Sequence, residues 1–494
     1  MKNNNGFTLI ELLTVLVVLA LILIIAIPKI GDIITNSREK AYRITIKQIE
    51  SATQKYLFSN FDNSSIRSGD FIEISLQDLK TKKFLDRTIK NPRNNKNIEN
   101  SKKVVVENVN GKLIYNVIID NQITVFDGGK YHIITAGYYN GLYGWGSNEN
   151  NELSPDGGEY VTTPINIDKD NTYLNNERVI DIASCYANNI VLTESNKVYI
   201  WGVNNEGQLG TGNYDAQLTP YNITSSFNGD VIIDVECGEE SSFAITEEND
   251  LYVWGYNSYG LLGGNDDDEI LSPVKATATS GYQQYNLKIK KVAATSESAV
   301  YITTDNKVYS IGENVEGQLG NGTTISTDKK VNITSSFDSP ITKISAGRDH
   351  FIALTENGEI YTWGGNSYGQ IGNNTTNNQL IPLKINIEDK LIYTISAGYY
   401  HSGVVTTTGE VYMFGNNDYG QLGNNTRINQ LTPINISEYF NGEKIKKISL
   451  SYRNSYALSY DNNFYAWGRN SEYGAVGNGS DKHQLTPTII NIIK

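Results

Sequence analysis

The sequence is poor in the residues that build most metal centres and catalytic sites. Among its 494 residues there are two cysteines, four histidines and ten prolines. Two cysteines cannot form a disulfide scaffold or a four-cysteine zinc site. The sequence also contains no G-x-x-x-x-G-K-[ST] loop and no H-E-x-x-H pair. We therefore expect no enzymatic activity, no cofactor and no metal site.

Charged residues are also scarce, and most of them are acidic. They make up 19% of the chain against 39% hydrophobic residues, which excludes a polytopic membrane protein and a charge-driven disordered chain. The net charge of −13 and the isoelectric point near 5.0 argue against a nucleic-acid partner. The charge is uneven, with +6 in residues 1–120 and −19 in the rest. This difference indicates two modules that meet near residue 120.

One long apolar run lies near the N-terminus. Residues 7–27 contain a single charge, Glu11. A helix of this length reaches about 31 Å, enough to cross a bilayer core of about 30 Å. The basic leader is too short and the apolar run too long for a secretory signal peptide. A carboxylate inside a membrane costs about 2.5–3.5 kcal/mol at the centre, so Glu11 needs a partner unless it lies close enough to the interface to stay hydrated.

The same segment resembles a known processing signal. Gly6, the run FTLIELLTVLVVLALILIIAI and the following Pro28 are similar to the N-terminus of type IV prepilins and pseudopilins. The resemblance implies a leader over 1–6, which a prepilin peptidase removes between Gly6 and Phe7 before methylating the new amino group. It also implies a transmembrane and filament-core helix over 7–28, in which Glu11 pairs with the terminal amine of a neighbouring subunit.

Residues 29–120 have the pattern of a small α+β domain. Apolar residues at helical spacing predict that the first helix continues to about Phe58. A short second helix is expected over 75–85. Two strands joined by Asn110 and Gly111 predict a hairpin. A long helix packed on a small sheet matches the globular part of pilins.

From residue 121 onward the chain repeats itself. A large apolar residue followed by glycine recurs at intervals of 51 to 57 residues, always with a tyrosine two positions earlier. Each repeat reads as three strands, a Gly-Gln-Leu-Gly stretch, a variable loop and a last strand that usually begins near Thr-Pro. About 50 residues and four strands per repeat indicate a propeller blade. The repeated apolar residues are Trp145, Trp201, Trp254, Ile311, Trp363, Phe414 and Trp467.

The segments 201–210, 350–364 and 414–423 resemble repeats of the regulator of chromosome condensation superfamily. The resemblance implies a closed seven-bladed β-propeller over 121–494. The expected fold is therefore mainly β, with the propeller preceded by a long transmembrane helix and a small α+β pilin-like domain. Such propellers serve several functions, so the fold alone assigns no activity.

The histidines and cysteines have structural interpretations. His132, His350 and His401 share one position in the repeat, whereas His483 stands alone in a loop. The acidic run 266–269 lacks the alternating ligands of a calcium loop and fits a solvated turn better. Cys185 and Cys237 occupy nearly the same position in neighbouring repeats, and we predict two buried free thiols.

The candidate ligand site is a register that varies. Two positions follow the small residue that ends the first strand of each repeat, and they do not keep one residue type. If that strand is the inner one, as the resemblance implies, these pairs ring one mouth of the central channel. Tyrosine and arginine often dominate interface energetics, and aromatic faces suit sugar rings. The ring comprises Tyr131, Tyr186, Glu239, Glu240, Arg348, Asp349, Tyr399, Tyr400, Tyr452 and Arg453. These residues could also be ordinary loop positions, and the loops before each Thr-Pro are a competing surface.

These patterns together predict a pilin-like subunit of a type IV pilus that displays an extracellular propeller for adhesion or for binding a protein or glycan. A propeller is roughly 50 Å wide, whereas packed core helices lie about 10 Å apart. Propellers on every subunit would clash, which favours a minor or tip subunit. The alternative is a pseudopilin-like part of a secretion or DNA-uptake fibre, with the propeller as a cargo-selecting cap. The expected partners are other pilin subunits, the prepilin peptidase and an extracellular protein or glycan, and no nucleic acid. The chain would cross the bacterial cytoplasmic membrane once before assembly and then lie on the cell surface.

Overall fold

The structure is a computed structural model, and it divides the chain into two units, Met1–Asp120 and Asn121–Lys494. The described residues are 44–45, 47–60, 71–90, 98, 103–109, 112–118, 123–128, 134–138, 141–148, 153, 160–168, 173–174, 177, 179–184, 187–262, 269–276, 287–471 and 474–490. Among these residues no helix is both long and apolar enough to cross a membrane. The predicted span 7–28, with Gly6, Phe7 and Glu11, lies outside them.

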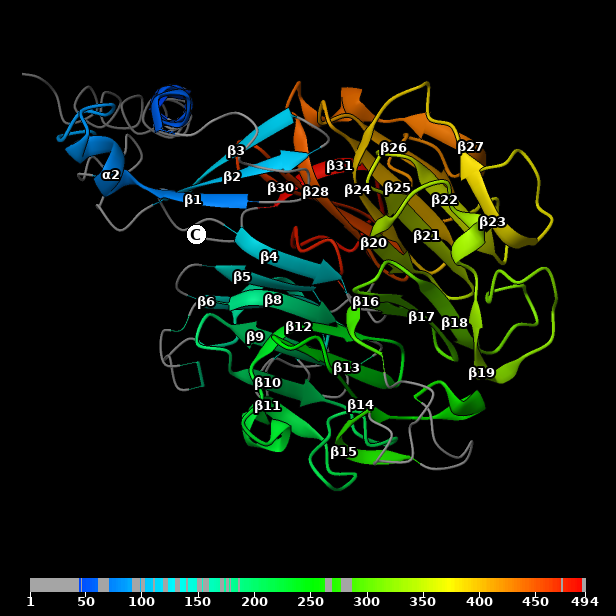
Figure 1. The fold of residues 1–494 in the computed structure, drawn as a ribbon. Coiled ribbons are helices and arrows are strands. Elements are labelled where there is room, and N and C mark those ends of the chain that lie inside the picture. The colour runs from blue at the N-terminus through cyan, green and yellow to red at the C-terminus, as the bar shows by residue number, and fades with distance from the viewer. Residues whose placement is uncertain are drawn as a thin grey trace, which may run out of the picture. The chain divides into compact units, whose positions relative to one another are not determined.

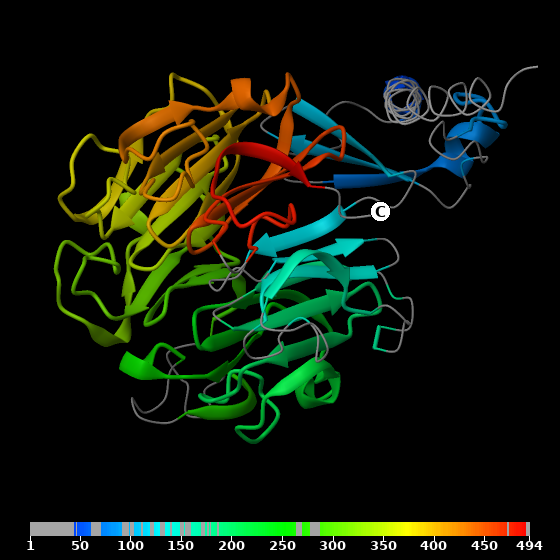
Figure 2. The same cartoon turned by 180° about the vertical axis from the view of Figure 1, so that it is seen from behind.

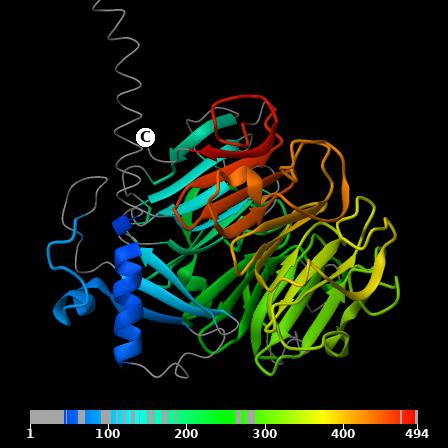
Figure 3. The same ribbon diagram turned by 90° about the horizontal axis from the view of Figure 1, so that it is seen from above.

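The first unit pairs a helix with a three-stranded sheet. Residues 47–60 are helical. The antiparallel strands β1 (Phe71–Ser75), β2 (Lys103–Val109) and β3 (Lys112–Ile118) follow each other in space, and β1 leads into helix α2 (Leu76–Thr81). The Ser75 hydroxyl accepts the Asp78 N–H and caps α2. Ile49, Tyr56, Leu79 and Val106 belong to one core that joins the helices to the sheet (Figure 3).

The second unit is built from four-stranded antiparallel sheets, in which each strand pairs with the next along the chain. The strand pairing gives seven such sheets, one for each sequence repeat. The first three are β4 (Ile123–Gly128), β5 (Ile134–Tyr138), β6 (Gly141–Ser147) and β7 (Tyr160–Asn166); β8 (Val179–Ser184), β9 (Asn188–Thr193), β10 (Val198–Gly202) and β11 (Gln217–Asn222); and β12 (Ile232–Cys237), β13 (Ser241–Thr246), β14 (Leu251–Gly255) and β15 (Ile270–Lys275).

The remaining sheets follow the same order. They are β16 (Ile289–Ala294), β17 (Ser298–Thr303), β18 (Val308–Gly312) and β19 (Thr327–Asn332); β20 (Ile341–Ala346), β21 (His350–Thr355), β22 (Ile360–Gly364) and β23 (Gln379–Ile385); β24 (Ile392–Ala397), β25 (His401–Thr406), β26 (Val411–Gly415) and β27 (Gln430–Asn435); and β28 (Ile445–Leu450), β29 (Asn454–Ser459), β30 (Phe464–Gly468) and β31 (Gln484–Ile490). Short 3-10 turns follow or precede outer strands at η1 (Thr224–Phe227), η2 (Ser258–Gly260), η5 (Thr334–Ser336) and η6 (Ser437–Phe440).

The sheets are arranged around a central axis. The first strand of each sheet contacts the first strand of the next, and β28 contacts β4, which closes the ring. Figures 1 and 2 show β8, β12 and β16 toward the middle and β15, β19 and β23 at the periphery. The prediction of a mainly β propeller, with the first strand of each repeat innermost, is confirmed.

The repeated tryptophans explain the repeated sequence. All five tryptophans are completely buried. The indole N–H of Trp254, Trp363 and Trp467 donates at 2.8–2.9 Å to the backbone carbonyl of the glutamine in the Gly-Gln-Leu-Gly stretch of the preceding repeat. Each of these bonds therefore joins two neighbouring sheets. The glycine after the tryptophan is required because Gly364, at φ +101°, would place a Cβ 2.3 Å from the Asp349 carbonyl oxygen.

A buried asparagine three residues after each of these apolar positions holds the outer loop. In the fifth sheet, Asn366 donates to the carbonyls of Thr375 and Asn377 at 3.0 and 2.8 Å and accepts the Ile371 N–H at 3.0 Å. Our sequence interpretation did not identify these residues, although their fixed spacing is a visible signal. The seven are Asn148, Asn204, Asn257, Asn314, Asn366, Asn417 and Asn470, and all are buried.

Candidate binding face at the channel mouth

The strand order decides which loops share a face. In an antiparallel sheet of four consecutive strands, the connection from the first strand to the second and the connection from the third to the fourth emerge on the same side. The variable pairs lie in the first connection and the loops before Thr-Pro in the second. The loops before Thr-Pro therefore share a face with the variable pairs. Contacts between the two connections agree, since Arg453 Nη1 donates to the Tyr419 hydroxyl at 3.0 Å and the Tyr368 and Tyr400 rings lie 4.7 Å apart.

Eight of the ten predicted ring residues are described. They follow the ends of the inner strands β12, β20, β24 and β28, whereas Tyr131 and Tyr186 lie outside the described residues. Seven of the eight are partly buried, and the side chain of Arg348 is 44% exposed. The register therefore presents Glu239, Glu240, Arg348, Asp349, Tyr399, Tyr400, Tyr452 and Arg453 at one end of the inner strands.

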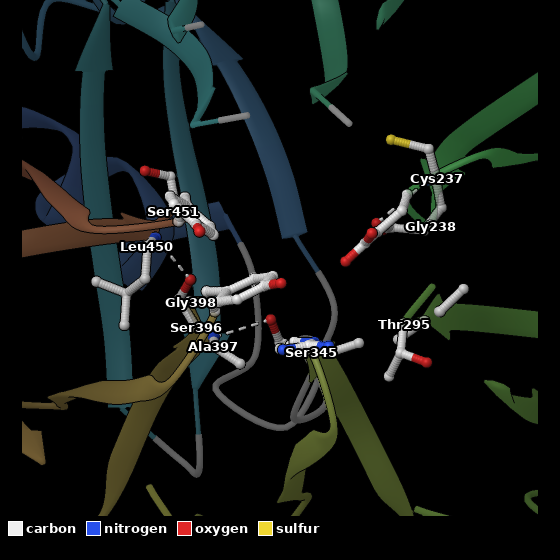
Figure 4. Close-up of a pocket in the computed structure, with 18 of the residues that line it drawn as sticks. Cys237, Gly238, Thr295, Ser345, Ser396, Ala397, Gly398, Leu450 and Ser451 are labelled. Atoms are coloured by element: carbon white, nitrogen blue, oxygen red, sulfur yellow. Dashed lines mark hydrogen bonds between the residues drawn. The ribbon is translucent and has the colours of Figure 1, made fainter. Parts of the chain in front are cut away.

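A cavity of about 160 Å³ lies between the ends of the inner strands. Its wall includes Glu239, Arg348, Tyr399 and Tyr452, the first residue of each described pair in the ring, and none of the second residues. Figure 4 shows Thr295, Ser345, Ser396 and Ser451 around the same space. The candidate ring thus separates into an inner set, which lines the cavity, and an outer set, of which Tyr400 and Arg453 contact the loops.

Serine hydroxyls join neighbouring inner strands below the rim. Ser345 Oγ in β20 accepts the Ala397 N–H of β24 at 3.0 Å, and Ser396 Oγ in β24 accepts the Leu450 N–H of β28 at 3.0 Å (Figure 4). Backbone bonds add to these, from Arg348 N to Tyr399 O and from Tyr399 N to Ser451 O, both at 3.1 Å. The residues at the mouth are therefore held by backbone that is tied across sheet boundaries.

Aromatic and arginine side chains form a continuous cluster on the part of the face that follows β20, β24 and β28. The Tyr399 ring lies 4.3 Å from that of Tyr452 and 4.6 Å from that of Tyr400. The Arg348 guanidinium lies 5.2 Å from the Tyr399 ring centre and donates to the Tyr400 hydroxyl. The Arg453 guanidinium lies 4.6 Å from both the Tyr452 and the Tyr419 ring centres. These distances are within the range of cation–π attraction.

Carboxylates dominate the part of the face that follows β12 and β16. Burial and the nearby Glu239 raise the pKa of Glu297 above its usual range. Burial and the charge of Glu297 do the same to the pKa of Glu313. Burial, together with the Glu239 carboxylate, also raises the pKa of the Tyr399 hydroxyl, so this tyrosine stays neutral. The mouth therefore has an acidic side and an aromatic–arginine side.

The two described histidines at the shared repeat position, His350 and His401, have a structural role. His350 and His401 are completely buried, and burial lowers the pKa of each to about 3. Their Nε2 atoms lie 2.9 and 3.0 Å from the hydroxyls of Ser402 and Ser455 respectively. Each of these serines lies on the second strand of the next sheet. Among the described residues no three His, Cys, Asp or Glu side chains gather as metal ligands. His132 and residues 266–268 lie outside that set.

The cysteine prediction is wrong. Cys237 is disulfide-bonded, and the described part of the chain contains no free cysteine. The other cysteine of the sequence, Cys185, lies outside the described residues. The prediction assumed that equivalent points on neighbouring sheets are too far apart for a bond. At the channel mouth the inner strands converge, and the 3.1 Å backbone bond from Arg348 N to Tyr399 O joins equivalent positions of neighbouring sheets.

Comparison with known proteins supports both parts of the sequence interpretation. Residues 141–494 match the RCC1-like domain, and residues 1–27 match the prokaryotic N-terminal methylation motif. The chain is 28% identical over 376 residues to the ultraviolet-B receptor UVR8 of Arabidopsis thaliana, which covers 75% of this chain and 82% of the receptor. Among solved structures, yeast RCC1 (Prp20) bound to Kap60 superposes with a TM-score of 0.61 at 20% identity, covering 75% of this chain and 85% of that one.

The expectation that the chain is not an enzyme needs correction. The human E3 ubiquitin-protein ligase HERC2 is 29% identical over 326 residues, which cover 64% of this chain but only 6% of the ligase. A second relative is named as a probable E3 ligase, HERC6. These relatives contradict the expectation as it was made. The similarity lies in the RCC1-like part of the chain, so it does not itself establish an enzymatic activity here.

Sheet topology, the Trp-Gly repeat and the match over 141–494 agree with one another. The resemblance inferred from the repeats and from the N-terminal signature is confirmed. The chain belongs to the RCC1-like domain family and carries a prokaryotic N-terminal methylation motif ahead of that domain.

Proposed function

We propose that this chain is a pilin-like subunit, minor or at the tip of a type IV pilus, that displays its propeller outside the cell to bind a protein or glycan surface. The methylation motif supports the pilin-like assignment. The binding role is supported above all by one observation, the continuous Tyr–Arg cluster beside the cavity at the channel mouth. Aromatic and arginine side chains that are partly exposed and close together are typical of interface hot spots.

The N-terminal helix and the propeller would have different partners. Other pilin subunits would contact the N-terminal helix, with Glu11 paired to a neighbouring terminal amine, and the prepilin peptidase would act at Gly6 and Phe7. The propeller would meet the extracellular ligand. Yeast RCC1, which shares the fold, has been crystallised bound to Kap60.

The attachment test removes two rings from the cavity wall. We expect Tyr399→Ala combined with Tyr452→Ala to reduce attachment of piliated cells to their target surface about tenfold or more, with little change in the melting temperature. Tyr221→Ala, which removes a tyrosine that is 49% exposed on the outer strand β11, is the matched control. Unchanged attachment by the double variant would remove the channel mouth from the proposal.

Processing and location are tested separately. Intact-mass measurement of the protein from its native cell should show a chain that begins at N-methylated Phe7, and immunogold labelling should find it on long surface filaments. A mature chain that still begins at Met1 would contradict the pilin-like assignment. Labelling confined to the cell envelope would favour the pseudopilin alternative.

A further inference from the structure

We propose that the corner around Tyr419 binds the acidic group of an anionic saccharide, and that a neighbouring sugar ring of the same chain enters the cavity at the channel mouth. This inference rests on the proposed function and names its ligand class. The arginine corner is defined as Tyr419, Arg427, Arg453, Arg469 and His483, which come from the loops of the last two sheets.

Cationic side chains converge on one ring. The guanidinium groups of Arg453 and Arg469 lie 4.6 and 5.5 Å from the centre of the Tyr419 ring, and the His483 ring lies 5.3 Å from it. Burial lowers the pKa of His483, and the charges of Arg427 and Arg469 lower it further. In a protein with a net charge of −13, this corner is a local concentration of positive charge.

Two arginines on this face differ in their counter-ions. Arg348 lies 3.7 Å from the Asp349 carboxylate. Arg453 is partly buried, and within the described part of the chain its partners are the Tyr419 hydroxyl and two aromatic rings, with no ion pair to a carboxylate. The adjacent carboxylate of Asp418 accepts a hydrogen bond from Asn416 at 2.9 Å. A partly buried guanidinium held in place without a carboxylate is suited to an anionic ligand, because its planar donors match carboxylate, sulfate and phosphate groups.

His483 supplies a further hydrogen-bond donor. Its Nδ1 accepts the backbone N–H of Asn470 at 3.0 Å. The neutral ring therefore carries its proton on Nε2, so that atom can donate a hydrogen bond. The corner thus offers donors from arginine and from a neutral imidazole.

The cavity next to the corner favours a saccharide over a simple anion. Tyr452 connects the two sites, since its ring contacts Arg453 and also lines the cavity. A volume of about 160 Å³ is close to that of a cavity of ~150 Å³ that admits a benzene ring, so one six-membered ring can enter. Tyr399 and Tyr452 provide aromatic faces for the apolar side of such a ring, and hydroxyls such as those of Thr295 and Ser451 provide polar groups around it.

Calorimetric titration of the purified full chain in detergent micelles tests the proposal. The probes are a hyaluronan hexasaccharide, which carries carboxylates, a heparin hexasaccharide, which adds sulfates, neutral maltohexaose, and hexaglutamate as an acidic chain without sugar rings. We expect both acidic saccharides to bind more tightly than maltohexaose and hexaglutamate, and the difference between them to show which acidic group is preferred. Equal binding of maltohexaose, tighter binding of hexaglutamate, or no binding of either acidic saccharide would overturn the proposal.

Variants locate the binding. Arg453→Ala should weaken binding of the preferred saccharide about tenfold or more, and Arg453→Lys should weaken it less, because the charge remains but the planar fork is lost. Lys384→Ala is the control and should change affinity less than about threefold, since it removes a cation of the outer strand β23 that pairs with Glu359 at 2.7 Å. Melting temperatures show whether each variant is folded. Equal losses from Arg453→Ala and Lys384→Ala would indicate nonspecific charge attraction and would overturn the assignment to this corner.

The proposed function can be judged apart from this inference. If no acidic saccharide binds the purified chain while attachment of cells still depends on Tyr399 and Tyr452, the ligand class is wrong and the adhesive role stands. If attachment does not depend on Tyr399 and Tyr452 and no acidic saccharide binds, both the adhesive role and the ligand class are wrong.

Discussion

The interior of the propeller and its channel-mouth face use the same repeat in opposite ways. In the interior, one residue type makes one contact from sheet to sheet, as the indole bonds of Trp254, Trp363 and Trp467 show. On the face, one backbone position carries glutamate after β12, arginine after β20 and tyrosine after β24 and β28. The interior must satisfy the same buried groups each time. The face has no such constraint, so its residues can be divided into an acidic side and an aromatic–arginine side.

The largest effect is expected from breaking one interior repeat. Asn366→Ala removes donors to two loop carbonyls and the acceptor for the Ile371 N–H. We expect a loss of about 2–4 kcal/mol in the free energy of unfolding, since several buried groups lose their partners. Urea denaturation measures it, and Asn377→Ala in the same loop, where the side chain is exposed, is the control. A loss below about 0.5 kcal/mol would show that the asparagine is not the anchor of the loop.

A smaller effect distinguishes two sheets that look alike in sequence. The Gln421 carbonyl accepts from Trp467 and also from the Ser455 hydroxyl, at 2.9 and 2.7 Å. The Gln318 carbonyl accepts from Trp363, and Phe351 occupies the position of that serine.

We therefore expect Trp363→Phe to cost about 1–3 kcal/mol and Trp467→Phe less, because a second donor remains for the Gln421 carbonyl. Comparing the two variants by urea denaturation gives the difference. Phe414 occupies the same position in the sixth sheet, so a phenylalanine fits the fold. Equal losses in both variants would mean that packing, and not the hydrogen bond, accounts for the tryptophans.

The smallest effect concerns the acidic side of the face. The folded protein raises the pKa of Glu297 through burial and through Glu239, so its ionised form is destabilising. Glu297→Gln should therefore raise stability slightly at pH 7, by less than about 1 kcal/mol because the group is partly exposed.

The sign of the pH dependence follows from the raised pKa. As the pH falls through the raised folded pKa, wild-type Glu297 takes up a proton and its penalty disappears, so the advantage of the variant should vanish below the unfolded value near 4.3. Melting temperatures of both proteins between pH 7 and pH 4 test this. A difference that stays constant with pH would show that the carboxylate charge is not its cause.

Much of the propeller could be predicted because its interior is repetitive. The spacing of Trp-Gly and Tyr is enforced by burial in each sheet, so it is visible in one sequence without a structure. The candidate ring was found for the complementary reason, as a register that varies between repeats that otherwise agree. The buried asparagines such as Asn366 were not predicted, although they carry the same kind of signal, because asparagine is common in exposed turns and its spacing alone does not show that it is buried.

The sequence by itself determined the period, the number of strands in each repeat and the processing signal, because each depends on residues that are close together in the chain. Only the tertiary structure decided that the loops before Thr-Pro share a face with the ring, that Cys237 is bonded, and that Arg348 has a carboxylate partner while Arg453 lies between two tyrosines. Tyr419 reaches Arg453 from 34 residues earlier in the chain. Such contacts form because the sheets converge around one axis. The spacing of residues along the chain does not show which loops of neighbouring sheets come close together.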